Sequence, residues 1–140
     1  MRNKIRVVIY WIIVLALGYI IWNTFSSFIY SYETTKVSWY GPGFNGKLTA
    51  NGEIFSQDSL TCASPELPFN TRVLITNPNT GQSIKVRVND RGPFKMDKEG
   101  KAIFPLEPHP IRSFDLSKKA FSEIASTKKG VIKISYRIVN

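Results

Sequence analysis

The 140-residue sequence has one cysteine, Cys62, and one histidine, His109. A single cysteine excludes an internal disulfide bond. The two residues cannot supply the ligand sets that bind zinc and related metals, so we expect no metal ion and no cofactor. No basic residue lies near Cys62 in the sequence, which indicates a small buried side chain rather than a nucleophile.

Acidic residues are absent from the first 32 positions, although the basic residues Arg2, Lys4 and Arg6 lie there. The rest of the chain has 16 basic and 10 acidic residues, and its charges are scattered singly or in pairs. This pattern is typical of a solvated basic surface, and we expect no nucleic-acid partner. Such a surface would also suit an anionic polymer.

Charge is also absent from residues 7–32, and residues 7–22 are almost entirely apolar. This run supplies the roughly 20 residues that a membrane-spanning helix needs. The alternative is a cleaved signal peptide, which has an apolar core of about 7–15 residues followed by a small-x-small site. Because Ala16-Leu17-Gly18 lies inside the run rather than after it, we predict an uncleaved transmembrane anchor over residues 7–29.

Basic residues flank this anchor only on its N-terminal side, because the next one is Lys36. The positive-inside tendency therefore predicts a cytoplasmic tail at residues 1–6. The chain would cross the cytoplasmic membrane once, with the rest on the periplasmic or extracellular side. Trp11, Trp22 and Tyr30 are spaced to lie near the two membrane interfaces. We expect a tether at residues 30–36 and a folded domain at residues 37–139.

Alternation of apolar and polar residues dominates that domain and predicts strands. The strands are expected at residues 36–40, 72–77, 83–89 and 131–139. The second and third strands, joined by a turn at residues 78–81, form the clearest hairpin. Residues 95–112 are polar and rich in proline, which predicts a surface loop.

One helix is predicted, opening at Asp115 or Ser117 and ending at Gly130. Its apolar face would consist of Leu116, Ala120, Phe121, Ile124 and Ala125. Short strands with a single helix favour a small closed barrel, so the domain is expected to be mainly β.

An acid stands where the third of these strands ends. The alternating Val86 and Val88 lead to Asp90, and Gly92-Pro93 stops the strand because proline cannot donate to a ladder. Asp90 and Arg91 are thus expected at the mouth of the sheet, where they can meet a ligand. The alternative is an aspartate that only caps its own turn.

Several short motifs occur in a fixed order along the domain: Ser38-Trp39-Tyr40-Gly41, Thr49-Ala50-Asn51-Gly52-Glu53, Leu60-Thr61, Leu67-Pro68-Phe69, Thr71-Arg72-Val73, Val88-Asn89-Asp90-Arg91-Gly92-Pro93-Phe94 and Asp115-Leu116-Ser117. This order resembles the double-psi β-barrel domain of the rare lipoprotein A family, which includes lytic transglycosylases of the bacterial cell envelope. The resemblance covers residues 37 to 139. It implies a six-stranded double-psi β-barrel with one short helix, a barrel that expansins share.

The resemblance also implies site residues. Asp90, Glu53 and Asp115 correspond to the acids of the family motifs, and they are the expected catalytic residues. The family has a histidine where this sequence has Ser64. Expected substrate-binding residues are Trp39, Tyr40, Asn51, Ser64 and Arg91. The residues alone leave an alternative for each of these roles. Glu53 could be a solvated charge on a loop, and Asp115 could be a helix cap. Trp39 and Tyr40 could be aromatic residues of the core.

The reaction requires few catalytic groups from the protein. A glycoside hydrolase uses two carboxyl groups, but in a lytic transglycosylase the sugar's own 6-hydroxyl attacks, so one carboxyl group can serve as acid and then base. We therefore predict a membrane-anchored protein that cleaves peptidoglycan glycan strands. The alternative is a non-catalytic glycan-binding or expansin-like wall-loosening module, which the serine at position 64 favours. Cell-division or other envelope proteins are further possible partners.

Overall fold

The computed structural model describes residues 2–29 and 32–139. The chain divides into two compact units, Met1–Ser31 and Tyr32–Asn140. Each unit is described by itself below.

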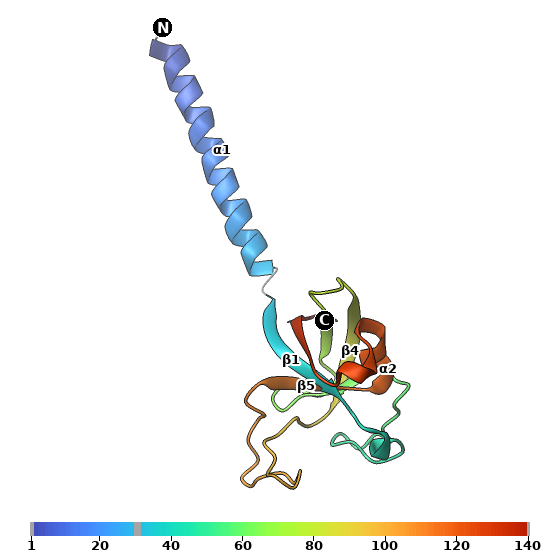
Figure 1. Ribbon diagram of the computed structural model, residues 1–140. Coiled ribbons are helices and arrows are strands. Elements are labelled where there is room, and N and C mark those ends of the chain that lie inside the picture. The colour runs from blue at the N-terminus through green and yellow to red at the C-terminus, as the bar shows by residue number, and fades with distance from the viewer. Residues whose placement is uncertain (1, 30–31, 140) are drawn as a thin grey trace. The chain divides into compact units, whose positions relative to one another are not determined.

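The first unit is the helix α1, Arg2–Ile29 (Figure 1). Its segment Lys4–Thr24 is 21 residues long and apolar enough to cross a membrane. At 1.5 Å per residue it measures about 31 Å, close to the thickness of a bilayer core. A signal sequence of this length and composition would satisfy the same criteria. Tyr30, expected at a membrane interface, lies outside the described residues.

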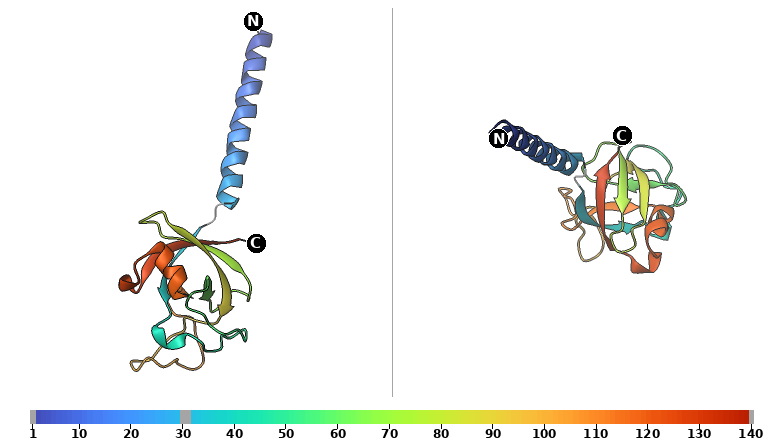
Figure 2. Two further views of the ribbon diagram at one scale, coloured as in Figure 1. Left: turned by 90° about the vertical axis from the view of Figure 1, so that its right-hand side faces the viewer. Right: turned by 90° about the horizontal axis from the view of Figure 1, so that it is seen from above.

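The second unit is a closed barrel of six strands, counted over residues 32–139. The strands are β1 (Glu33–Trp39), β2 (Thr61–Ala63), β3 (Arg72–Thr76), β4 (Ser83–Asp90), β5 (Arg112–Leu116) and β6 (Ile132–Ile138). Around the barrel they follow the order β1-β5-β2-β4-β3-β6, and Figure 2 shows them encircling a common interior. β1 runs parallel to β5 and β2 runs parallel to β4, whereas the other neighbours are antiparallel. The expected mainly β, six-stranded barrel is confirmed.

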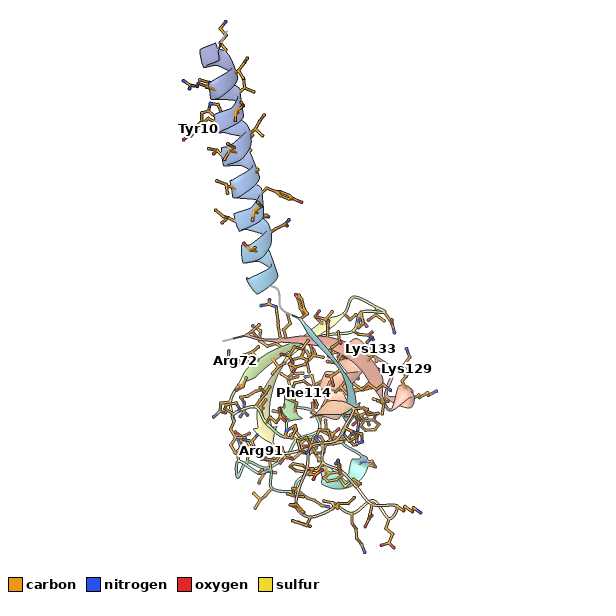
Figure 3. The ribbon with its side chains drawn as sticks, turned by 90° about the vertical axis from the view of Figure 1, so that its left-hand side faces the viewer. Tyr10, Arg72, Arg91, Phe114, Lys129 and Lys133 are labelled. Carbon is orange, nitrogen blue, oxygen red and sulfur yellow. The ribbon has the colours of Figure 1, made fainter. Side chains whose placement is uncertain are left out.

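Alternate residues of the strands fill the barrel, as the period of two requires. Val86 and Val88 of β4 are almost completely buried, and so are Phe114 and Leu116 of β5. Figure 3 shows Phe114 inside the barrel. The helix α2 (Lys118–Ile124) adds three further buried side chains to the same core: Ala120, Phe121 and Ile124.

Of the two residues expected to open the helix, the structure shows that Ser117 does so. Ser117 is the N-cap, and its hydroxyl accepts a hydrogen bond from the Ala120 N–H at 3.2 Å. Asp115 and Leu116 belong to β5, so the expectation of a helix-opening Asp115 and a helical Leu116 is wrong. The pattern was ambiguous because Leu116 fits both the period of two of the strand and the helical period that follows.

The helix also ends earlier than expected. Ala125 has an extended backbone (φ −162°, ψ 159°), so α2 stops at Ile124. Gly130, with φ +66°, instead terminates a short 3-10 helix, η2 (Thr127–Lys129). Its positive φ is one that glycine adopts readily.

The remaining strand predictions agree with the structure apart from their bounds and two omissions. The hairpin is β3–β4 and the last strand is β6, whereas β1 begins three residues earlier than expected, at Glu33. The sequence did not predict β2 or β5. The surface loop is confirmed over residues 95–111, and it leaves the same end of the barrel as residues 41–57 (Figures 1 and 2).

Candidate active site

Asp90 is the last residue of β4, at this end of the barrel. It pairs in register with Ala63 of the parallel strand β2. Gly92, two residues on, has φ +122°, which favours glycine, and a Cβ there would meet the Phe94 ring at 3.8 Å. The chain therefore turns sharply after Asp90, which leaves its side chain at the mouth of the sheet.

The carboxylate of Asp90 accepts three hydrogen bonds. The Tyr40 hydroxyl donates to Oδ2 at 2.7 Å, and the backbone N–H groups of Ala50 and Arg91 donate to Oδ1, each at 2.8 Å. The donors come from the residue that follows β1, from the loop after it and from the turn itself. They fix the orientation of the carboxylate in the half-buried position where the strand ends.

Tyr40 is itself held firmly by aromatic neighbours. Its ring centroid lies 4.6 Å from that of Phe55 and 5.3 Å from that of Phe44. Burial, together with the hydrogen bond to Asp90, raises the pKa of the Tyr40 phenol far above its ordinary value. The phenol therefore keeps its proton and remains a donor to Asp90 throughout the physiological pH range.

A cleft of about 270 Å³, called the Asp90 cleft below, opens beside this carboxylate. Five of the predicted site residues line it: Trp39, Tyr40, Asp90, Arg91 and Asp115. The sequence did not identify Ser38, Phe44, Phe94, Met96 and Arg112 as lining residues. The ring of Phe44 is about half exposed and offers a flat apolar face at the rim.

Asp115 faces the Asp90 cleft from β5. The Ser38 hydroxyl donates to its Oδ1, and Arg112 Nη1 lies 3.4 Å from the same oxygen. Arg112 also donates to the Ser38 hydroxyl. The side chains of Arg112 and Asp115 are only 21% and 22% exposed, so this is a shielded ion pair linked by a buried serine. In the sequence Arg112 and Asp115 are three positions apart, a spacing that places two side chains on opposite faces of a strand. The sequence pattern therefore did not predict this ion pair.

Glu53 and Asn51 do not line the Asp90 cleft. Arg87 donates to both carboxylate oxygens of Glu53, each at 2.8 Å, and the Asn89 amide donates at 3.1 Å. These hydrogen bonds lower the pKa of Glu53 to about 2. The Asn51 Oδ1 accepts from the Thr49 hydroxyl and from the Glu53 N–H, which closes the turn at residues 49–53. Both residues thus order the loop whose Ala50 N–H contacts Asp90.

Ser64 lies beside Asp90 and is 3% exposed. Its N–H donates to the Asp90 carbonyl at 3.1 Å, while its hydroxyl accepts from the Leu67 N–H at 3.2 Å. Arg91 donates to the carbonyls of Ser64 and Leu67, and its guanidinium lies 3.8 Å from the centre of the Phe69 ring. Figure 3 shows Arg91 on the barrel. These contacts tie the segment after β2 to the Asp90 turn.

Trp39 is half-buried and packs against the barrel core. Its indole N–H donates to the Thr127 carbonyl at 3.2 Å, so one edge of the ring is engaged within the fold. Among the described residues, no group of three or more His, Cys, Asp or Glu side chains could hold a metal ion.

Known proteins resemble this chain over the whole barrel. A family model described as lytic transglycolase matches residues 32–136. A probable endolytic peptidoglycan transglycosylase RlpA from Synechocystis is 65% identical over 88 residues, which cover 63% of this chain and 26% of that protein. The endolytic peptidoglycan transglycosylase RlpA of Campylobacter jejuni is 41% identical over 102 residues, which cover 73% of this chain and 32% of that protein. The chain thus spans about a third or less of the length of these relatives.

Two solved structures share the fold. A Streptomyces papain inhibitor has a TM-score of 0.56 and 22% identity, covering 79% of this chain and 96% of the inhibitor. An expansin of Clavibacter michiganensis in complex with cellohexaose has a TM-score of 0.51 and 22% identity, and the match covers 77% of this chain and 51% of the expansin. At this identity the likeness concerns the fold alone.

The family match supports the double-psi β-barrel fold, and the observed closed barrel of six strands agrees with it. With three quarters of its residues inside the matched region, the chain belongs to the lytic transglycolase family.

Proposed function

We propose that the protein cleaves the glycan strands of peptidoglycan as a lytic transglycosylase, with Asp90 as the acid and base. One observation carries the proposal. The Asp90 carboxylate is held by Tyr40 and two backbone N–H groups at the edge of a 270 Å³ cleft that a second acid, Asp115, also lines. The relatives named as endolytic peptidoglycan transglycosylases support the choice of substrate.

The reaction needs one carboxyl group and no water. Asp90, which enters the reaction as the carboxylic acid, gives its proton to the glycosidic oxygen as the bond between that oxygen and C1 of the muramyl residue breaks. The 6-hydroxyl oxygen of the same sugar bonds to C1, and its proton passes to the Asp90 carboxylate. The products are a free 4-hydroxyl group and a 1,6-anhydro end, and Asp90 is returned to its starting state.

The other residues of the cleft have supporting roles in this proposal. Asp115, oriented by Ser38 and Arg112, stabilises the positive charge that develops at C1. The exposed ring of Phe44 stacks on a sugar. Glu53 acts at a distance, because its ion pair with Arg87 orders the loop that carries the Ala50 N–H.

The helix α1 would hold the protein in the cytoplasmic membrane, with its N-terminus inside and the barrel on the peptidoglycan side. The apolar length of Lys4–Thr24 supports this proposal, as do the basic residues that precede the apolar run. Such an anchor would keep the barrel next to newly made wall, where cell-division or envelope proteins act.

A second function, glycan binding without cleavage, is favoured by Ser64. Its hydroxyl accepts from the Leu67 N–H and cannot shuttle a proton as a histidine would. A protein of this kind would bind strands through the same cleft and leave them intact.

The deciding experiment uses the full chain in detergent micelles with purified glycan strands, with and without stem peptides. Mass analysis should find new 1,6-anhydro-muramyl ends with the wild type and none with Asp90→Asn. Glu123→Gln is the matched control, since Glu123 is an exposed acid on α2, away from the cleft. If the wild type binds strands but forms no new ends, and Ser64→His forms none either, the protein has the glycan-binding function instead.

A further inference from the structure

A second hollow, of about 180 Å³, adjoins the Asp90 cleft. Ser64, Glu66, His109 and Tyr136 are among the residues that line it. Arg112 lines both hollows, so the two hollows meet at this residue. A ligand that leaves the Asp90 cleft past Arg112 therefore enters a space bounded by His109.

The main chain of His109 is tied to the Asp90 turn. Its N–H donates to the Pro93 carbonyl at 2.9 Å, and an antiparallel bridge joins Phe94 to Pro108. The long loop at residues 95–111 thus returns to the segment that follows Asp90 before β5 begins. This arrangement ties the main chain of the half-buried His109 to the segment that follows Asp90.

The two ring nitrogens of His109 have different surroundings. Nδ1 accepts a hydrogen bond from the Ile111 N–H at 3.3 Å, so it is unprotonated. In a neutral imidazole the proton is then on Nε2, which becomes a donor. No side chain or backbone group in the described part of the chain bonds to Nε2. The ring therefore has one nitrogen anchored to the protein and one left for a ligand.

Electrostatics favours this neutral state. Burial and the nearby Arg112 guanidinium lower the pKa of His109, whereas Asp115 opposes the shift. Glu66 lines the same hollow from the segment after β2, and Lys36 and Lys133 line a neighbouring hollow that His109 also borders. A proton on Nδ1 would in addition point at the Ile111 N–H, so two donors would face each other and this hydrogen bond would be lost. At neutral pH His109 is an uncharged donor, not a general acid.

We propose that His109 is a substrate-positioning residue, whose Nε2–H donates to a hydroxyl or acetamide oxygen of the glycan on the side of Arg112 away from Asp90. The proposal rests on the proposed function, because it extends the path of the same glycan strand. A sugar bound there would hold its neighbour in register over Asp90. Removal of the donor therefore raises KM more than it lowers kcat.

The test uses the fact that His109 is the only histidine. Full-length Asp90→Asn protein in detergent micelles, with its histidine labelled by ¹⁵N, is titrated with purified glycan strands. The Asp90→Asn background prevents turnover. We expect the Nε2 resonance of His109 to shift on binding. In the wild-type background, we expect His109→Ala to raise KM about tenfold, the usual effect of losing one hydrogen bond of about 1.4 kcal/mol.

Two variants separate positioning from a structural role. His109→Gln keeps an N–H donor near the position of Nε2 and should restore most of the KM, whereas Lys101→Ala, an exposed change on the same loop, should alter neither constant. Thermal melts should match the wild type for all three. A KM that rises equally with Gln and Ala, together with a lowered Tm, would assign His109 a structural role.

The outcomes also separate the two proposals. Strands that are cleaved while the His109 resonance and the KM of His109→Ala remain unchanged would overturn this inference alone. Strands that neither bind nor are cleaved would overturn both.

Discussion

The Tyr40 hydroxyl donates to Oδ2 of Asp90 across 2.7 Å, which joins the residue after β1 to the last residue of β4. The two residues are 50 positions apart in the sequence. The closed barrel brings them together at one end, where both line the same cleft. Tyr40 thereby controls the direction of the carboxylate on which the proposed reaction depends.

Tyr40→Phe should lower the rate of glycan cleavage by about 10- to 100-fold. The ring and its packing on Phe55 remain, but a hydrogen bond to a charged group, worth about 1.5–3 kcal/mol, is lost. Initial rates of anhydro-end formation provide the measurement. Phe55→Leu keeps the phenol and serves as the control for aromatic packing, because Phe55 contacts Tyr40 but does not line the Asp90 cleft. Wild-type rates in Tyr40→Phe would show that Asp90 needs no such orientation.

Ser117→Ala should destabilise the barrel by about 1 kcal/mol, because Ser117 is the N-cap of α2. Asp115→Asn should instead lower activity, since Asp115 lies on β5 and faces the Asp90 cleft. Urea unfolding and cleavage assays on both variants provide the comparison. The reverse pattern, with Asp115→Asn unstable and active, would return Asp115 to a structural role.

The Glu53–Arg87 pair should make stability depend on pH in acid. The pKa of Glu53 is about 2 in the folded protein, below its ordinary value of 4.5. The pair therefore stabilises the fold above pH 4.5, and this contribution is lost as the pH falls toward 2. With the two side chains 33% and 42% exposed, we expect about 1 kcal/mol or less.

The measurement is the difference in the free energy of unfolding between wild type and Glu53→Gln, at pH 7 and near pH 2. The difference should be present at pH 7 and vanish near pH 2. Glu99→Gln, which removes a much more exposed partner of Lys101, should show no difference at either pH. A Glu53→Gln effect that persists at pH 2 would contradict the ion pair as its source.

Cys62 should be unreactive in the folded protein. Its side chain is 1% exposed, and burial raises the pKa of its thiol well above the ordinary value. Since the thiolate is the reactive form, a maleimide should label Cys62 only after the protein is unfolded. Mass analysis before and after denaturation gives the extent of labelling. Rapid labelling of the folded protein would show that the strand β2 opens locally.

The barrel should lie outside the cytoplasmic membrane and stay tethered to it. Protease added to spheroplasts should therefore degrade the barrel, and a carbonate wash should leave the intact chain with the membranes. The basic residues before the apolar run and the length of Lys4–Thr24 are the reasons. Release of a shortened, soluble protein would establish cleavage of a signal peptide.

The sequence by itself determined the features that depend on local pattern. The apolar run of α1, the β3–β4 hairpin, strand β6 and the turn after Asp90 all follow from the spacing of apolar residues, glycine and proline. The motif order added the six-stranded barrel as an expectation. Asp90 at the mouth of the sheet was therefore predictable.

Only the tertiary structure decided which of the other candidates meet. Pairing of β1 with β5 places Ser38 opposite Asp115, and Arg112 completes their shielded cluster. Glu53 instead pairs with Arg87, 34 residues away, outside the cleft. The strand β2 was not predicted because it has only three residues, and β5 was not predicted because its last residues also fit the helical pattern that follows. The conformation of both strands depends on parallel partners distant in the sequence. Local patterns set the strands, whereas barrel closure selects the contacts between them.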